Sequence, residues 1–588
     1  MVNRFPRPHC HAMPESVEPM ERHTMSDELQ KLQDDFITGC VTRRDLLVRA
    51  AALGLSAPAL ASFLAACGSG GSAPTHQSQA VGSTVLTPPA KGEIGRVNWG
   101  LFYEPSGLDW IFSYNYEENT VVTNITESLM RLTPQFTIEP SLAESFSEPD
   151  PLTKIYKIRP GVNFSDGSPM TVGDVVFSLR RHLDPSSYWN FAYGNVKSVD
   201  QTGAAEVTVA MKRPDEVFHP LMATPAGGVG KASYVKSKGK AYGTPSAGPL
   251  GTGPFVFKSW AQGASITLAR NGTYWDTSHK PKAHEFVFSF IPQESTMTTA
   301  LLSGEIDGAY HTPYSGLGQL RSSSSGKLYL GRSMIFTEII IASSSGPLAN
   351  HSLRSALLLA IDRAALAKAV YNSAATPLRN TVVPLGEWGY GQSQAKAAWA
   401  KLGAPVVDLK KARQLVTQAG SPKQTMTIAT RASFQRYIDI ATIVQAAAKQ
   451  IGLSVRIKPI SPNSYGDLFF DAKARAGIDM FISENYADIP EPLEILYPAV
   501  VPGQFYNYNG YNNPAVTKDL SRASTQHIDN KRAALVLSAQ AVLANDLAAL
   551  PLANPAVPLF LNRKITGAPA SFCYLYYPWA RDIGSSGQ

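Results

Sequence analysis

Short segments in which apolar and polar residues alternate are frequent in the first half of the chain. Alternation over five to eight residues is typical of strands that bury one face. Such strands are predicted at residues 95–102, 154–158, 205–211, 253–260 and 265–270. The last two form a predicted hairpin, which turns at Gln262-Gly263.

Helical spacing of apolar residues interrupts this pattern twice. Residues 172–183 place Val172, Val175, Val176 and Leu179 on one face, so a helix is predicted there. Thr171 and Asp174 have the spacing of a capping box at its start. A second helix is predicted at residues 116–129.

Strands and helices alternate more regularly in the second half. A βα unit is predicted at 286–292 and 295–302. Further strands are predicted at 335–343, 424–430, 454–460 and 480–483, and further helices at 352–359, 363–371, 409–419 and 438–451. This alternation predicts a largely parallel sheet. The chain is therefore predicted to be a mixed α/β protein with at least two lobes.

The segment that precedes the first predicted strand has the features of an export signal. Arg43 and Arg44 stand before an apolar stretch that ends in Leu64-Ala65-Ala66-Cys67, as in a twin-arginine signal with a lipobox. Cleavage before Cys67 would free its thiol to carry a diacylglycerol. Residues 46–66 are also long enough to span a bilayer, so a retained anchor or a buried helix stays open.

The residues around this signal fit a removable leader and a tether. Residues 67–93 are rich in Gly, Ser, Pro and Thr and lack apolar periodicity, which is typical of a flexible linker. Met25 is an alternative start to Met1. Cleavage would remove Cys10 and Cys40 and lipidation would use Cys67, so Cys573 alone would remain and no intrachain disulfide is expected.

Composition excludes several classes of protein. Hydrophobic residues make up 44% of the 588 and charged residues 17%, which excludes disorder of the whole chain. A mean hydropathy of −0.10 excludes a polytopic membrane protein. The net charge of +7 is spread over the chain without basic runs, so no nucleic-acid partner is expected.

A series of short strings then occurs in order through residues 95–580. They are 140–146 (PSLAESF), 156–167 (YKIRPGVNFSDG), 174–179 (DVVFSL), 251–255 (GTGPF), 270–275 (RNGTYW), 303–307 (SGEID), 353–363 (LRSALLLAIDR), 412–420 (ARQLVTQAG) and 487–492 (ADIPEP). Together they resemble the extracytoplasmic solute-binding proteins of ABC importers, of the oligopeptide- and dipeptide-binding (family 5) type.

This resemblance implies an α/β fold of the periplasmic-binding-protein type II-like class, with two lobes, a hinge and an extra subdomain in lobe I. The implied divisions are a signal peptide at 1–66, a linker at 67–93, lobe I at 94–332, lobe II at 333–552 and a C-terminal return to lobe I at 553–588. The hinge is expected near 330–342 and 548–558. A monomer is expected, with ligand held between lobes that close on it.

Two residues are candidates for the charged ends of a bound peptide. The resemblance places Asp488 where peptide-binding members hold the α-ammonium, and Arg431 where dipeptide-type members hold the carboxylate. Both follow predicted strands, and α/β folds bind ligands at carboxyl strand ends. A turn or helix-capping role for Asp488 and a surface role for Arg431 stay open.

The cleft is also expected to contain aromatic residues, with one departure from the family. Peptide-binding members usually carry a Trp three residues before the aspartate, and here Asn485 stands there, which suggests a more polar ligand. Tyr486 is the candidate to replace that contact. Trp99 and Tyr103, at the end of the first strand, are expected to line the cleft or to lie in the core.

The expected function is that of a binding protein, not an enzyme, that needs no cofactor. It would capture a short peptide or similar zwitterion and deliver it to an ABC permease with separate ATPase subunits. Its expected place is the periplasm or the outer face of the cytoplasmic membrane, anchored by lipid at Cys67. The alternatives are an oligosaccharide, opine, nickel chelate or glutathione as ligand, a sensing lipoprotein, and a twin-arginine-exported cofactor enzyme.

Motifs for other chemistry are weak. His279 and His284 have no third ligand at a useful spacing, so no metal site is expected. The chain has no Gly-x-Ser-x-Gly, no His-Glu-x-x-His and no phosphate loop that ends in Gly-Lys-Ser/Thr.

Overall fold

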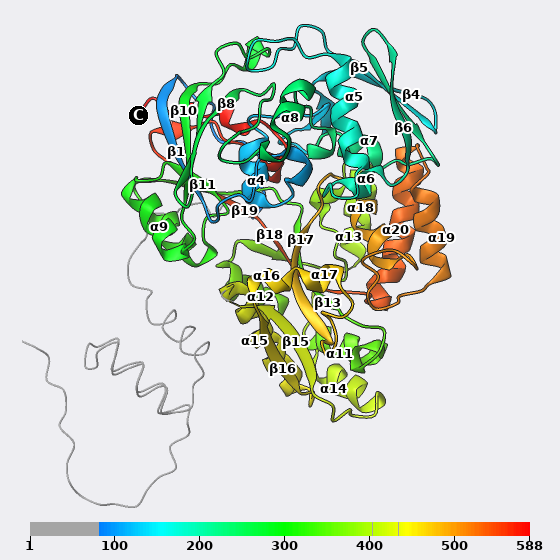
Figure 1. Ribbon diagram of the computed structural model, residues 1–588. Helices are drawn as coiled ribbons and strands as arrows, with labels where there is room; N and C mark the ends of the chain where they lie inside the picture. Colours follow the sequence, from blue (N-terminus) through cyan, green and yellow to red (C-terminus); the bar gives the residue numbers. More distant parts are fainter. Residues whose placement is uncertain (1–80, 403, 433) are drawn as a thin grey trace, which may run out of the picture. The chain divides into compact units, whose positions relative to one another are not determined.

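The computed structural model describes residues 81–402, 404–432 and 434–588 (Figure 1). The predictions on Arg43, Arg44 and Cys67 lie outside the described residues. Two large mixed sheets form the framework, and a smaller antiparallel sheet is attached to the first.

The first large sheet contains seven strands from distant parts of the sequence. In spatial order these are β12 (Gly326–Gly331), β19 (Val557–Asn562), β11 (Gly308–Tyr310), β1 (Ile94–Leu101), β10 (Ala283–Phe290), β9 (Ser265–Arg270) and β8 (Phe255–Ala261). The predicted hairpin is the β8–β9 pair. Strand β1 lies parallel to both β10 and β11, while the other neighbours are antiparallel.

The second large sheet differs from the prediction of a largely parallel arrangement. Its order is β14 (Ala375–Pro377), β18 (Leu550–Pro555), β13 (Ile335–Ile341), β17 (Met480–Tyr486), β15 (Met426–Arg431) and β16 (Val455–Ile460). Only the β15–β16 and β15–β17 pairs are parallel. The prediction was wrong because the chain enters this sheet through β13 and leaves it through β18. These two strands are neighbours, and they run in opposite directions because both connect to the first sheet.

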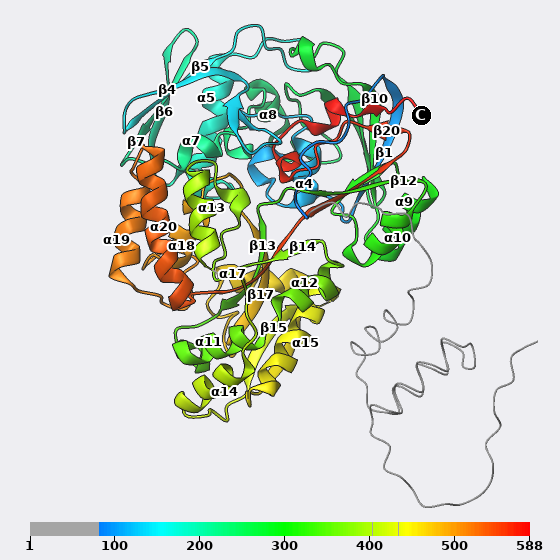
Figure 2. The same cartoon turned by 180° about the vertical axis from the view of Figure 1, so that it is seen from behind.

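Two connections lead from one large sheet to the other. Residues 332–334 join β12 to β13, and Ala556 joins β18 to β19. Figures 1 and 2 show the second crossing as an almost straight passage from β18 into β19. Because these segments are short, they are suited to act as a two-stranded pivot.

The smaller sheet extends the first lobe. Its order is β4 (Ala143–Asp150), β5 (Thr153–Ile158), β7 (Glu206–Met211) and β6 (Val196–Gly203), and α5 (Val172–Arg180) packs against it. The expected capping box is present: Asp174 accepts from the Thr171 amide at 2.9 Å, and Thr171 Oγ1 accepts from the Asp174 amide at 3.2 Å. Short elements nearby are β2 (Met130–Leu132), β3 (Ile138–Pro140), α6 (Asn190–Tyr193), α7 (Phe218–Leu221) and α8 (Ala232–Lys238).

The helix predicted at 116–129 is shorter than expected. Helix α4 spans Tyr116–Val122. Beyond it, the carbonyl oxygens of Asn124 and Ile125 accept from the amides of Phe255 and Gly253, at 3.0 and 2.8 Å. These bonds to a distant segment replace the helical ones, so tertiary contacts end the helix.

Helices cover the second sheet and form a separate group beside it. Around the sheet lie α11 (His351–Ala360), α12 (Arg363–Tyr371), α14 (Leu409–Gln418), α15 (Gln435–Gln450), α16 (Pro462–Tyr465) and α17 (Asp467–Phe470). The separate group comprises α13 (Gln392–Lys401), α18 (Leu493–Val500), α19 (Pro514–Ala523) and α20 (Asp529–Asp546), which share a hydrophobic cluster of their own. The remaining elements are α9 (Glu294–Ser303), α10 (Leu317–Ser322), β20 (Ile565–Thr566) and β21 (Gly584–Ser585).

Two further properties concern the described residues only. None of their helices combines the length and apolar character needed to cross a bilayer. Cys573 is a free cysteine with no exposed surface, and burial raises the pKa of its thiol.

Candidate functional site

A cavity of about 2230 Å³ is lined by residues from both lobes. Tyr103 and Tyr116 line it from the first lobe, and Glu338, Arg431 and Asp488 line it from the second. Pockets for small ligands usually measure about 300–1,000 Å³. This space is therefore large enough for a ligand of several residues together with water.

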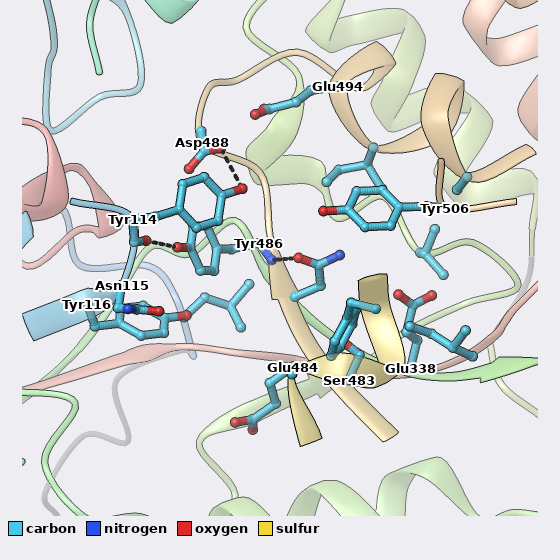
Figure 3. A pocket seen from close by; sticks show the side chains of 18 of the residues that line it. Tyr114, Asn115, Tyr116, Glu338, Ser483, Glu484, Tyr486, Asp488, Glu494 and Tyr506 are labelled. Atoms are coloured by element: carbon cyan, nitrogen blue, oxygen red, sulfur yellow. Dashed lines mark hydrogen bonds between the residues drawn. The ribbon is translucent and has the colours of Figure 1, made fainter. Parts of the chain in front are cut away.

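Asp488 lies just beyond the end of β17 and lines this cavity while only 2% of its surface is exposed. The hydroxyls of Tyr114 and Tyr576 donate hydrogen bonds to its carboxylate, the first at 3.3 Å (Figure 3). Burial raises the pKa of Asp488, and these donors counteract that rise. Both donors come from elements distant in sequence, so the hydrogen bonds of the Asp488 carboxylate are not those of a local turn.

Glu494 is the second carboxyl group at this position. Figure 3 shows its carboxyl directed toward Asp488. Burial and the charge of Asp488 raise the pKa of Glu494 well above its ordinary value, so Glu494 holds a proton and donates it toward Asp488. A carboxylate has about four acceptor sites, and Tyr114, Tyr576 and Glu494 use three. One acceptor direction on Asp488 thus remains for a ligand.

Tyr486 and Asn485 lie at the end of β17, which is longer than predicted. The Tyr486 hydroxyl donates a hydrogen bond to the backbone oxygen of Tyr114 at 2.7 Å. The centre of the Tyr486 ring lies 5.1 Å from that of Tyr116 and 5.2 Å from that of Phe572. Asn485 Oδ1 accepts from the Tyr486 amide at 2.9 Å. Both residues line the cavity, and Tyr486 connects the two lobes across it.

Arg431 ends strand β15 and lines the cavity with a guanidinium that pairs with no carboxylate among the described residues. Its Nε atom is buried without a hydrogen-bond partner, and the group lies 4.8 Å from the Phe434 ring centre. Arg436 differs, because Glu484 binds it at 2.8 Å. Arg431 therefore remains available to an anion.

The two aromatic candidates of the first lobe differ in position. Tyr103 is 45% exposed and lines the cavity. Trp99 has no exposed surface, and its ring packs against Tyr310 and Trp579 at 5.2 and 4.5 Å. Trp99 is thus a buried part of the cavity wall, a position that combines the core and lining roles expected from the sequence.

Acidic groups greatly outnumber basic ones around the cavity. The basic lining residues are Arg213, Arg431 and Arg436. The acidic ones are Glu104, Glu117, Glu118, Asp215, Glu294, Glu338, Glu484, Asp488 and Glu494. Glu494 holds a proton, and burial raises the pKa of Glu338 to about 8 and that of Glu117 to about 7, but the other six carboxyl groups still outnumber the three arginines. This smaller excess favours a ligand that brings positive charge.

Glu338 and Glu387 are buried carboxyl groups that the sequence interpretation missed. Glu338 is 6% exposed, lies in the middle of β13 and lines the cavity. Glu387 has no exposed surface, and both its carboxyl oxygens lack a partner among the described residues. The signal for Glu338 was present, because it is the only charged residue in the apolar run Ile335–Ile341.

The histidine pair singled out in the sequence forms separate surface contacts. His279 Nδ1 lies 2.9 Å from Asp276, and His284 Nε2 lies 2.8 Å from Glu93. Within the described residues, no group of three or more His, Cys, Asp or Glu side chains has an arrangement suited to a metal ion.

Comparison with known proteins places this architecture in a family. The sequence model described as "Bacterial extracellular solute-binding proteins, family 5 Middle" matches residues 137–507. A Pseudomonas aeruginosa (strain UCBPP-PA14) protein named "Probable di/tripeptide-binding protein 5" is 25% identical over 500 residues, which cover 79% of this chain and 91% of that protein. The "Glutathione-binding protein GsiB" of Escherichia coli O1:K1 / APEC is 23% identical over 457 residues, or 76% and 86% of the two chains.

A solved structure shows the same fold. The "ABC transporter-associated periplasmic binding protein DppA from Helicobacter pylori in complex with peptide STSA" superposes with a TM-score of 0.70 at 22% identity. The match covers 84% of this chain and 99% of that one. The predicted two-lobed α/β fold of the periplasmic-binding type is thereby confirmed.

Proposed function

Because the chain belongs to the bacterial extracellular solute-binding proteins of family 5, we propose that it captures a short peptide or a similar zwitterion and delivers it to an ABC permease. The observation that carries this proposal is the pairing, in one cavity, of a buried carboxylate at Asp488 with an unpaired guanidinium at Arg431. Binding and release are the whole of the proposed activity, with no bond made or broken.

The two groups match the two ends of a peptide. A carboxylate accepts charge-assisted hydrogen bonds from an α-ammonium, and a planar guanidinium can hold a carboxylate by two parallel bonds. Within a closed cleft each ligand charge needs a partner of opposite sign. Asp488 and Arg431 supply one of each, and both stand at or beyond carboxyl ends of strands in the second lobe.

Lobe closure would complete the site. Tyr103 and Tyr116 approach the cavity from the first lobe, while the charged pair belongs to the second. Rotation about residues 332–334 and Ala556 would bring these surfaces together around a ligand and exclude water. The Tyr486–Tyr114 hydrogen bond is a contact that such a rotation would form or break.

Calorimetry with a peptide panel tests this function. Di- and tripeptides with free ends are expected to bind, whereas N-acetylated and C-amidated versions should bind about tenfold or more weakly, because each lacks one charge. Mass spectrometry of ligand that co-purifies with the protein would identify the natural solute. The proposal fails if capped and free peptides bind alike, or if the co-purified ligand is an uncharged sugar.

Glutathione and related peptides with a second carboxylate are expected to fit this cavity less well than peptides of neutral or positive charge. Glutathione carries two carboxylates and one ammonium, and the cavity has an excess of acidic groups. We expect glutathione to bind at least about tenfold more weakly than a tripeptide with one carboxylate, since each unpaired charge in a closed site is costly. Equal affinities in the same calorimeter would contradict this expectation.

We also propose that the protein is exported by the twin-arginine route and anchored by lipid at Cys67. The order Arg43-Arg44, apolar stretch and Leu-Ala-Ala-Cys supports this. A Cys67→Ser variant is expected to lose metabolic labelling by palmitate, because serine has no thiol to carry the lipid. Arg43→Lys with Arg44→Lys should retain precursor in the cytoplasm. Palmitate labelling that persisted in Cys67→Ser would contradict lipidation at Cys67.

A further inference from the structure

We propose that the cavity contains a second cation-binding subsite, built on Glu338, that takes the basic side chain of a peptide whose α-ammonium is held at Asp488. The expected ligands are thus peptides with a lysine- or arginine-type residue. This inference rests on the proposed peptide-binding function and adds a preference for one class of side chain.

Glu338 faces the cavity from the centre of the second sheet. It pairs in register with Ser483 on β17 and with Pro551 on β18, so its backbone is fixed on both sides. Figure 3 shows its carboxyl directed toward the side of Tyr506, whereas Glu484, one position further along β17 from Ser483, points the other way. Glu338 makes no hydrogen bond or ion pair with any of the described residues.

Neither Arg436 nor Arg532 is available to Glu338, because each is bound by other carboxylates. Glu484, which lies on the opposite face of β17, binds the guanidinium of Arg436 at 2.8 Å. Arg532 of α20 is bound by Glu216 at 3.1 Å and by Glu491 at 3.5 Å. Glu338 is therefore a buried carboxyl group for which the described chain provides no positive partner.

The surroundings of Glu338 supply further acceptors. Glu387 and Tyr508 are close enough for the charge of Glu338 to raise the pKa of each. Gln540 of α20 lines the same cavity, is only 4% exposed, and has an Oε1 atom with no partner in the described chain. The unpaired amide oxygen of Gln540 and the carboxyl group of Glu338 suit a group with several N–H donors, such as an ammonium or a guanidinium.

Apolar residues beside these acceptors fit the stem of such a side chain. Val382, Leu543 and Pro551 line the cavity, and Pro551 is the register partner of Glu338. Long basic side chains bury their methylene groups along apolar surface and place the charge at the tip. A cationic ligand would offset the cost of leaving a carboxyl group alone in such surroundings.

A charge-specific peptide comparison tests the subsite. Lysine and Nε-acetyl-lysine are placed in turn at each position of a tri-alanine scaffold, and binding to wild type, Glu338→Gln and Glu305→Gln is measured by calorimetry. Glu305 is exposed and lies outside the cavity, so its variant controls for loss of one negative charge. At one position, wild type and Glu305→Gln should favour lysine over acetyl-lysine about tenfold or more, and Glu338→Gln should lose this preference.

A second arm separates this inference from the peptide function. The diamine 1,5-diaminopentane is titrated alone, and it is expected to bind wild type and Glu305→Gln but not Glu338→Gln. If peptides fail to bind but the diamine shows this pattern, the peptide function is wrong and the subsite stands. If peptides bind without a lysine preference and the diamine does not depend on Glu338, the subsite is wrong and the peptide function stands. Glu338→Met repeats both arms should the glutamine variant not fold.

Discussion

Replacing Asp488 by asparagine is expected to weaken the binding of free-ended peptides about 30-fold or more, because removing one partner of a buried charge pair costs roughly 2–5 kcal/mol. The amide keeps an oxygen that can accept from Tyr114 and Tyr576, so the local fold should survive. What disappears is the negative charge opposite the ligand's ammonium. Glu494 cannot replace that charge, because burial keeps its pKa well above the ordinary value.

The matched measurement uses the same peptides with an acetylated N-terminus. Wild type should discriminate strongly between free and acetylated peptides, while Asp488→Asn should discriminate little, since the variant has no negative charge to pair with the free ammonium. The Glu305→Gln variant should behave as wild type. Equal affinity of wild type and Asp488→Asn for a free-ended peptide would remove Asp488 from the site and would reopen a role limited to folding.

The parts of the site that were predictable from sequence are those fixed by local structure. Arg431 and Asp488 follow apolar runs that became β15 and β17, so their places at strand ends follow from the strands themselves. The Thr171 capping box also formed as predicted, because both of its hydrogen bonds join residues three positions apart. Such features need no knowledge of the rest of the chain.

The parts that were missed depend on contacts between distant segments. Tyr114 and Tyr576 reach Asp488 across sequence separations of 374 and 88 residues, and no local pattern marks them as its donors. The direction of β13 in its sheet depends on where β18 returns. Glu338 was visible as one charge in an apolar strand, but only the fold showed that it forms no ion pair with any described cation.

Replacing Glu338 by glutamine is expected to stabilise the ligand-free protein at neutral pH, by an amount that grows with pH. Burial raises the pKa of Glu338 to about 8, whereas an unfolded glutamate titrates near pH 4.3. Between these values the unfolded chain releases a proton that the folded protein retains, so this group lowers the free energy of unfolding as pH rises. Glutamine does not titrate, so the variant lacks this contribution to the pH dependence. The neighbouring groups Glu387 and Tyr508 are present in both proteins.

The difference between the two ligand-free proteins should therefore be near zero at about pH 4, grow between pH 5 and 8, and level off above pH 8. At pH 8 we expect on the order of 4–5 kcal/mol in favour of Glu338→Gln, since the two pKa values differ by nearly four units and each unit corresponds to about 1.4 kcal/mol. Denaturant unfolding of wild type and Glu338→Gln at several pH values measures this difference in the free energy of unfolding, and Glu305→Gln serves as the control. A difference that does not change with pH would mean that Glu338 is not held protonated by burial.

Saturation with a lysine peptide should reverse the sign of this difference. A cation beside Glu338 favours the ionised carboxylate and lowers its pKa, so binding at pH 7 should release close to one proton from wild type. Calorimetry in buffers of different ionisation enthalpy counts that proton, and neither the acetyl-lysine peptide nor Glu338→Gln should release it. In the ligand-free protein the buried carboxyl group of Glu338 lowers the free energy of unfolding. In the complex the same group would make binding of a cationic ligand more favourable, which would account for an acid in the middle of β13.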